Sequence, residues 1–299
     1  MKLRTRLEKT SGASAVAIGN FDGFHAGHKK IVDTLRAAAR AEGLHAVILT
    51  FHPHPRVFFR QPIRLISTDE QRRNTLRGLP LDYLFFLDFS AVADCPAADF
   101  VNDILLGTLK MKLLIIGEDF RFGRDRAGDL DFLRRQARKT PYRIIRARTV
   151  RRGGCRVASS QIRKKLAAGA IAEANRMLGH PYAIEGLVEQ GAGRGTRLGF
   201  PTINIATANQ ILPPGVFQTR TIVGKQCWPS VTNIGSAPTF TADAGAQVRV
   251  ETHIPGFQRM IYGKKVTVLF QNKIRAEIKF ASGLELIGQI RRDIASLKI

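Results

Sequence analysis

The chain has 299 residues, of which 44% are hydrophobic and 24% charged, a composition typical of a globular protein rather than a disordered or collagen-like one. Lys and Arg total 47 against 24 Asp and Glu, so the formal net charge is +23. We interpret this excess either as attraction for an anionic partner, phosphorylated small molecules or nucleic acid, or as a solvated basic surface without a specific partner.

The apolar runs and the spacing of the cysteines indicate the cellular compartment in which we expect the protein. No apolar run approaches the ~20 residues of a membrane-spanning helix, and the first residues lack the apolar stretch of a secretory signal, so we expect neither. Cys95, Cys155 and Cys227 are few and far apart, which argues against a disulfide scaffold and against a clustered zinc site. We therefore expect a cytoplasmic protein.

The first half of the chain alternates between strand-length apolar runs and helix-like stretches. This alternation predicts an α/β domain with a mostly parallel sheet covered by helices on both faces, and the continuously apolar strands agree with burial on two sides. The expected strands are 16–19, 47–51, 83–87, 113–117 and 142–147, and the expected helices are 28–42, 68–77, 97–110 and 129–139.

The second half has a different pattern. Helix-like pieces at 159–168 and 170–178 are followed by short β-rich runs separated by Gly and Pro, which predict a small antiparallel barrel, and by a helix at 284–296. We place the domain boundary at this change, giving domains 1–180 and 181–299. The expected barrel strands are 183–189, 202–205, 216–223, 231–234, 248–254 and 265–270.

The sequence GNFDGFHAGH, residues 19–28, joins the first expected strand to the first helix. Ligands of α/β sheets bind outside the carboxyl ends of the strands, and the unpaired N–H groups of a helix start attract phosphate. The glycines let the backbone approach a ligand closely. His25 and His28 are three residues apart, so they lie on one face of a helical turn and can donate to a departing pyrophosphate.

A second glycine-rich run, GAGRGTRLGFPTIN, occupies residues 191–204. Its amides can wrap a triphosphate, although the run is also compatible with a plain hairpin loop. Thr202 and Asn204 are two apart in an expected strand and therefore project to one side. A hydroxyl and an amide oxygen suit Mg²⁺, which bridges ATP phosphates.

These motifs resemble one known family, the bacterial bifunctional riboflavin kinase/FAD synthetases. FDGFHAGH is similar to the HxGH motif of its N-terminal nucleotidylyltransferase module, and GAGRGTRLGFPTIN is similar to its riboflavin kinase motif. The resemblance spans residues 16–293 with both modules in the family's order. Further similar segments are TFHPHP at 50–55, GEDFRFG at 117–123, ASSQIR at 158–163, and short kinase pieces at 214–217, 233–240, 250–253, 262–264 and 273–280.

The resemblance implies a Rossmann-like nucleotidylyltransferase domain of the HxGH type, followed by a small antiparallel β-barrel riboflavin kinase domain with a C-terminal helix. It implies that the barrel phosphorylates riboflavin to FMN with ATP, and that the first domain transfers AMP from ATP to FMN. The expected ligands are riboflavin, FMN, FAD, ATP, ADP and pyrophosphate, with Mg²⁺ as cofactor. No nucleic-acid or membrane partner is expected, and the oligomeric state is left open.

In the first module, the resemblance assigns His25, His28 and Arg163 to catalysis. The histidines stabilise the pyrophosphate, and the guanidinium fork contacts phosphate. Hydroxyls at a helix start can cap the helix or reach a phosphate oxygen. The ATP-binding residues expected there are Gly19, Asn20, Phe21, Asp22, Gly23, His25, His28, Asp119, Ser159, Ser160 and Arg163.

In the kinase module, the resemblance places Glu251 in the position of the catalytic base, where a carboxylate can orient the attacking hydroxyl and accept its proton. It assigns Asn233 and Arg275 to the flavin and Thr202 and Asn204 to the metal. The ATP-binding residues expected there are Gly191, Gly193, Arg194, Gly195, Gly199, Pro201, Thr202 and Asn204.

The chain departs from the family pattern in places, and two alternatives stay open. Residues 254–262 carry Arg259 and none of the family's usual acidic residues, so flavin affinity or loop movement is expected to differ. His52 stands at a usual Asp or Glu, and Ala158 at a usual Ser. One alternative is a nucleic-acid-binding protein that uses the basic stretch 121–152; the other is a nucleotidylyltransferase for a different precursor, which does not explain the second glycine-rich run.

Overall fold

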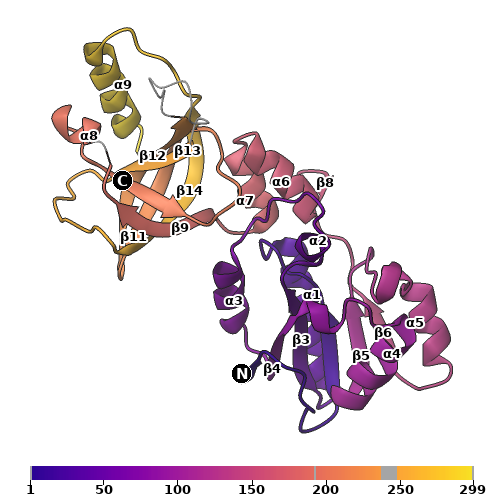
Figure 1. Ribbon diagram of the computed structural model, residues 1–299. Helices are drawn as coiled ribbons and strands as arrows, with labels where there is room; N and C mark the ends of the chain where they lie inside the picture. Colours follow the sequence, from indigo (N-terminus) through magenta and orange to yellow (C-terminus); the bar gives the residue numbers. More distant parts are fainter. Residues whose placement is uncertain (1, 192, 237–247, 298–299) are drawn as a thin grey trace. The chain divides into compact units, whose positions relative to one another are not determined.

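The computed structural model describes residues 2–191, 193–236 and 248–297. The chain divides into two compact units, Met1–Ala158 and Ser159–Ile299 (Figure 1). The sequence placed the boundary at 180/181, whereas helices α6 (Ser159–Ala167) and α7 (Ile171–Leu178) group with the second unit. One reason is the Asn175 side chain, which accepts from the Tyr182 N–H and donates to the Phe270 carbonyl, each at 2.8 Å.

The first unit contains the expected parallel sheet, with strand order β1-β4-β3-β2-β5-β6. All five residues of β2 are buried. Val16 and Ile18 join one hydrophobic cluster while Ala15 and Ala17 join another, because alternate side chains of a strand point to opposite faces. The strands are β1 (Lys2–Arg4), β2 (Ser14–Ile18), β3 (His45–His52), β4 (Tyr83–Asp88), β5 (Met111–Ile116) and β6 (Arg143–Arg146).

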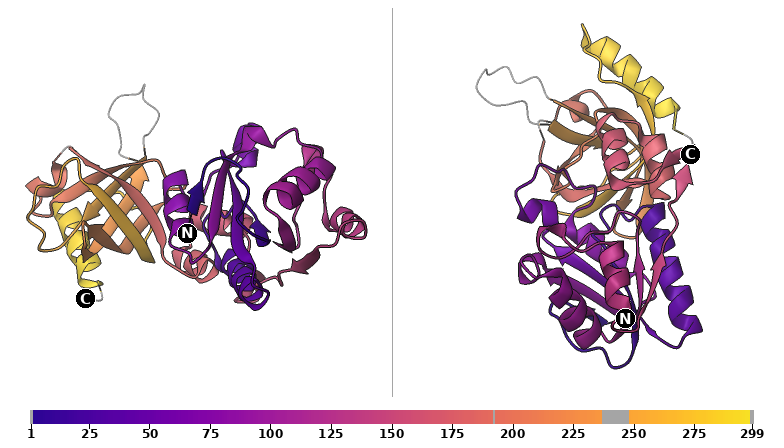
Figure 2. Two further views of the ribbon diagram at one scale, coloured as in Figure 1. Left: turned by 90° about the horizontal axis from the view of Figure 1, so that it is seen from below. Right: turned by 90° about the vertical axis from the view of Figure 1, so that its right-hand side faces the viewer.

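Helices cover both faces of this sheet (Figure 2). The expected helix at 97–110 is α-helical only over α4 (Ala97–Asp99) and continues as the π-helix η2 (Phe100–Thr108), in which the Leu109 N–H reaches back five residues to the Ile104 carbonyl. The remaining elements are α1 (Ala26–Ala41), α2 (Pro55–Phe58), α3 (Asp69–Arg77), η1 (Phe89–Ala91), η3 (Arg124–Arg126), α5 (Leu130–Ala137), β7 (Arg151–Arg152) and β8 (Cys155–Arg156).

The second unit contains the expected antiparallel barrel, closed in the order β10-β13-β12-β11-β14-β9 (Figure 2). Gly186 permits a close approach of two strands, since a Cβ there would collide with the Ala206 carbonyl. The strands are β9 (Tyr182–Glu189), β10 (Thr202–Thr207), β11 (Gly215–Val223), β12 (Gln226–Ser236), β13 (Val248–His253) and β14 (Lys265–Arg275); the helices α8 (Arg194–Arg197) and α9 (Gly283–Ala295) complete the unit.

The barrel interior is partly polar. Five buried hydroxyl residues bond to one another rather than to water, with oxygen–oxygen distances of 2.8 to 2.9 Å. Each hydroxyl can both donate and accept, so the group satisfies itself without a charge. The five residues are Thr219, Thr221, Ser230, Thr232 and Thr252.

Helix α9 is held by a buried ion pair. Asp293 is the fully buried residue of α9, and its Oδ2 accepts from Arg275 Nη2 at 2.8 Å and from Nε at 3.1 Å. Gln289 Nε2 donates to the other carboxylate oxygen at 2.8 Å. The structure thus engages Arg275, the expected flavin contact, in anchoring a helix. No helix of the described residues is long and apolar enough to cross a bilayer.

We expect Asp293→Asn to lower the free energy of unfolding of the barrel by about 3 kcal/mol, because it leaves a largely buried guanidinium without its counter-charge. The chain's single tryptophan, Trp228, lies in β12 and reports barrel unfolding by its fluorescence in a denaturant titration. Arg291→Ala, an exposed change on the same helix, should shift the midpoint little. If Asp293→Asn and Arg291→Ala shifted the denaturation midpoint equally, the anchoring role of Asp293 would be contradicted.

Candidate functional site

The start of α1 brings His25 and His28 together. His25 is the N-cap residue, and its Nδ1 accepts from the His28 N–H at 3.2 Å, so a neutral His25 carries its proton on Nε2. The two rings stack with centroids 3.7 Å apart. No acidic residue lies in the first turn of α1, so its exposed N–H groups favour an anion. Gly27 lets the His25 ring pack close to the backbone, since a Cβ there would lie 3.0 Å from that ring.

Three neighbouring residues expected to bind ATP have structural contacts of their own. Asp22 is buried and accepts from the N–H groups of Ile66 and Ser67, each at 3.0 Å. Gly23, at φ +76°, donates its N–H to the Ser67 hydroxyl at 3.0 Å. The Phe21 ring is buried, with its centroid 5.1 Å from that of His28. Together these contacts fix the shape of the loop that leads into α1.

Arg72 on α3 is a site-shaping residue that the sequence analysis missed. Its guanidinium donates to the Asn20 carbonyl at 2.8 Å, to the Phe51 carbonyl at 2.7 Å and to Asp69 at 2.7 Å. Burial lowers the pKa of the Arg72 guanidinium, and the Asp69 carboxylate opposes that shift. The sequence did contain a signal for the burial of Arg72. It lies four residues before Leu76, and therefore on the same helix face as this buried apolar residue.

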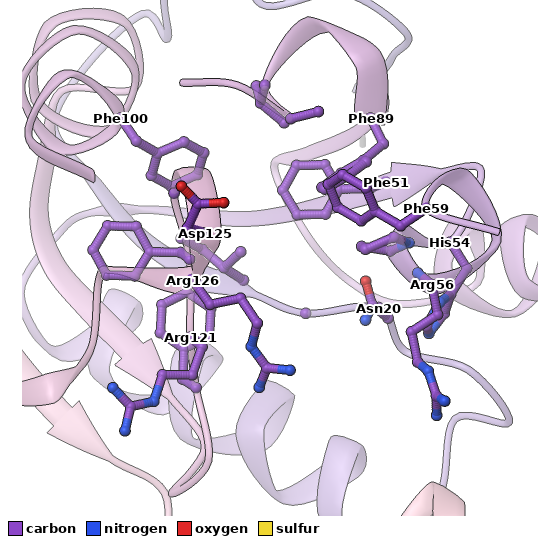
Figure 3. Close-up of a pocket in the computed structure, with 18 of the residues that line it drawn as sticks. Asn20, Phe51, His54, Arg56, Phe59, Phe89, Phe100, Arg121, Asp125 and Arg126 are labelled. Atoms are coloured by element: carbon purple, nitrogen blue, oxygen red, sulfur yellow. The ribbon is translucent and has the colours of Figure 1, made fainter. Parts of the chain in front are cut away.

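A cavity of about 570 Å³ opens at the carboxyl ends of the strands (Figure 3). Gly19, Asn20 and Asp119 of the expected ATP-binding set line it, and Asp119 also pairs with Arg156. The lining residues are Ile18, Gly19, Asn20, Phe51, His54, Pro55, Arg56, Phe59, Gln61, Phe89, Val92, Ala93, Phe100, Asp119, Phe120, Arg121, Phe122, Gly123, Asp125 and Arg126.

Aromatic rings dominate the walls of this cavity. Phe89 meets Phe51 and Phe59 edge-to-face, with ring centroids 5.6 and 5.7 Å apart. Phe100 lies across the cavity from these rings (Figure 3). Phe122 packs against Phe100 and Phe120, with ring centroids 5.5 and 5.4 Å apart. Two facing groups of rings suit a flat aromatic ligand.

Ser159, Ser160 and Arg163 begin α6 and therefore belong to the second unit, whereas His25 and His28 belong to the first. Ser159 and Ser160 occupy the first turn of that helix, as the sequence predicted. Their expected role with ATP phosphates stays a prediction.

In the barrel, strand register brings three expected site residues into one row. Glu251 on β13 lies opposite Asn204 on β10 and opposite Asn233 on β12. Val250 and Thr252 are buried in the barrel, so Glu251 between them points to the outer face. The buried Asn233 Oδ1 has no hydrogen-bond partner among the residues that the structure describes.

The glycine-rich loop packs against the beginning of this row. A Cβ at Gly191 would collide with the Asn204 amide, and one at Gly195 would lie 3.1 Å from the Thr202 hydroxyl. Gly199 has φ +84°, a conformation that favours glycine.

Of the other residues expected in the kinase loop, the structure describes Gly193 and Pro201 in full and Arg194 only in its backbone. Gly193 has φ +66°, and the Pro201 carbonyl lies 2.8 Å from His253 Nδ1. The backbone of Arg194 opens the short helix α8, but its side chain is outside the described part, as are residues 237–240 of the family-like segment 233–240.

Comparison with known proteins gives a separate family match for each half of the chain. The family model for FAD synthetase matches residues 7–161, and the model for riboflavin kinase matches residues 178–299. The chain belongs to the bifunctional riboflavin kinase/FMN adenylyltransferase family. The riboflavin kinase match accounts for the barrel, which a nucleotidylyltransferase for another precursor would leave unexplained.

Curated relatives of that description match over nearly the whole chain. The Escherichia coli K12 protein is 36% identical, covering 93% of this chain and 90% of its own. The Pseudomonas fluorescens protein is 37% identical (94% and 91%) and the Bacillus subtilis protein 32% (96% and 92%). A crystal structure from Streptococcus pneumoniae, described as a macrolide-efflux protein, has a TM-score of 0.86 at 26% identity, covering 98% of this chain and 97% of that one.

We expect Arg72→Lys to reduce kcat/KM for FAD formation from FMN about tenfold, since an ammonium cannot replace the planar fork at two carbonyls and loses about 1.5 kcal/mol of bonding. Riboflavin phosphorylation by the same preparation should change less than twofold. Arg77→Lys, at the exposed end of the same helix, is the matched control. Parallel loss of both activities would indicate general unfolding and contradict a local role.

Proposed function

We propose that each unit carries its own ATP site and that the two act in sequence on one flavin. As a family member, the chain phosphorylates riboflavin through its C-terminal half and adenylylates FMN through its N-terminal half. The observation that carries the proposal is the register that sets Glu251 between Asn204 and Asn233 beside the glycine-rich loop.

In the kinase step, Glu251 takes the proton of the riboflavin 5′-hydroxyl while that oxygen attacks the γ-phosphorus of ATP. The bond from the γ-phosphorus to the bridging oxygen breaks, and ADP departs. Alignment and charge neutralisation carry most of the rate in phosphoryl transfer. Asn233, next to Glu251 in the row, orients the flavin. We assign ATP to Gly191, Gly193, Arg194, Gly195, Gly199, Pro201, Thr202 and Asn204.

The residues of the barrel site fit Mg²⁺. The Thr202 hydroxyl and the Asn204 amide oxygen are hard donors that face the glycine-rich loop. When bound, Mg²⁺ neutralises charge on the phosphates.

In the adenylyltransferase step, an FMN phosphate oxygen attacks the α-phosphorus of ATP and pyrophosphate leaves. His25 and His28 donate to the departing pyrophosphate at the start of α1, where charge builds up. The isoalloxazine ring of FMN occupies the aromatic cavity. We assign ATP in the first unit to Gly19, Asn20, the backbone of the Phe21–Gly23 loop and Asp119. The expected contribution of Ser159, Ser160 and Arg163, which belong to the second unit, stays a prediction.

We also place the enzyme in the cytoplasm. Among the described residues, Cys95, Cys155 and Cys227 are free thiols, which suits a reducing compartment.

Glu251→Gln should lower the rate of FMN formation from riboflavin by about 10²–10³, because the base is lost, while FAD formation from added FMN persists. Chromatographic separation of the flavins measures both reactions. Glu173→Gln, a partly exposed change on α7 that removes the ion pair with Lys165, is the control. Normal FMN formation by Glu251→Gln would overturn the assignment of the base.

His28→Ala should show the reverse pattern, with FAD formation slowed about 10²–10³ by loss of one phosphate donor and FMN formation unchanged. Pyrophosphate release with FMN and ATP gives the rate. His45→Ala, at the amino end of β3, supplies a histidine control away from the site. Equal rates of pyrophosphate release by His28→Ala and His45→Ala would contradict the proposed role of His28.

A further inference from the structure

The turn that closes one wall of the aromatic cavity has an uncommon backbone. Gly123, Asp125 and Arg126 have φ values of +72°, +55° and +58°, and two of these three residues carry side chains that disfavour this region. Strained non-glycine residues cluster at ligand sites, where the surrounding structure holds them.

Specific contacts impose this conformation. A Cβ at Gly123 would lie 2.8 Å from the Ala97 backbone, so the turn presses against α4. The Arg124 N–H donates to the Cys95 carbonyl at 2.8 Å, and the Arg126 N–H donates to the Gly123 carbonyl at 3.0 Å. The turn is therefore clamped, and it presents Arg126 at the cavity wall.

Three guanidinium groups line this cavity (Figure 3). Arg121 and Arg126 lie on the wall that also carries Phe100, and Arg56 lies on the opposite wall, beside Phe59. Two of the three are engaged. Arg121 pairs with Asp129 at 2.6 Å, and Arg56 donates to the Gln61 side chain at 3.3 Å and to the Pro62 carbonyl at 3.2 Å.

Arg126 differs from the other two. Within the described part of the chain its guanidinium has no hydrogen-bond or ion-pair partner, although it lines the cavity. Asp125, its chain neighbour, points away from it toward Phe100 (Figure 3). An exposed cation without a partner among the described residues, at the edge of an aromatic cavity, fits a ligand that joins a flat ring to an anionic group.

We propose that Arg126 binds the 5′-phosphate of FMN and makes the N-terminal site select FMN over unphosphorylated flavin. This inference rests on the proposed adenylyltransferase site. FMN carries a flat ring and a phosphate in one molecule, whereas the ribityl chain of riboflavin ends in an uncharged hydroxyl. The strained turn aims the cation, and the aromatic walls hold the ring.

The test uses the full-length enzyme at saturating ATP, with FAD formation as the readout. Arg126→Gly removes the charge, while glycine adopts φ +58° without strain, so the turn persists. Its KM for FMN should rise about tenfold with kcat and the KM for ATP within twofold of wild type, as expected for loss of a charged contact to phosphate. The KM of Arg126→Lys for FMN should lie between those of the wild type and of Arg126→Gly.

Two controls separate phosphate recognition from damage to the cavity. Lumiflavin, which has the ring but no phosphate chain, should inhibit wild type and Arg126→Gly with the same Ki. Arg124→Ala, in the same turn but not lining the cavity, should leave the KM for FMN unchanged.

An unchanged KM for FMN in Arg126→Gly, a rise in the KM for ATP instead, or an equal rise in the lumiflavin Ki would each overturn the proposal. Absence of FAD formation by the wild-type enzyme would contradict the proposed function itself. Arg126 would then still be tested by comparing FMN binding to wild type and Arg126→Gly through quenching of flavin fluorescence.

Discussion

Two carbonyl groups near the carboxyl ends of β2 and β3 need partners, because parallel strands that end at a ligand site leave part of their backbone unpaired. A single buried guanidinium meets this need in the first unit. Arg72 binds the Asn20 and Phe51 carbonyls, and Asp69 balances its charge. Both carbonyls belong to residues that line the aromatic cavity. The geometry of the cavity therefore depends on a cation that does not itself line it.

In the barrel, the pleat of the strands imposes the corresponding constraint. Thr252 must point inward to complete the hydroxyl cluster, so its neighbour Glu251 must point outward. Closure of the barrel sets the register that aligns Glu251 with Asn204 and Asn233. The Glu251 carboxylate, which we propose as the base, is thereby positioned by packing on the opposite face of its own strand.

Much of this could be predicted from local sequence. The strands and helices follow from apolar periodicity, and the two phosphate sites that we propose were located from continuous motifs such as GNFDGFHAGH. What the sequence missed depends on tertiary contacts. Arg72 looked like an ordinary helical arginine, and the partner of Arg275 lies eighteen residues away on α9. The three-residue strand β1 was too short and too basic to show periodicity, and the π-helix η2 leaves no simple pattern.

The central claim is that the chain holds two separate nucleotide sites built on unlike scaffolds. A crystal structure with a non-hydrolysable ATP analogue and Mg²⁺ tests it most directly. The account predicts two nucleotides per chain, one with its phosphates at the start of α1 beside His25 and His28, and one with its phosphates in the loop that leads to Thr202 and Asn204. A single nucleotide per chain, with the other site closed to it, would contradict the account.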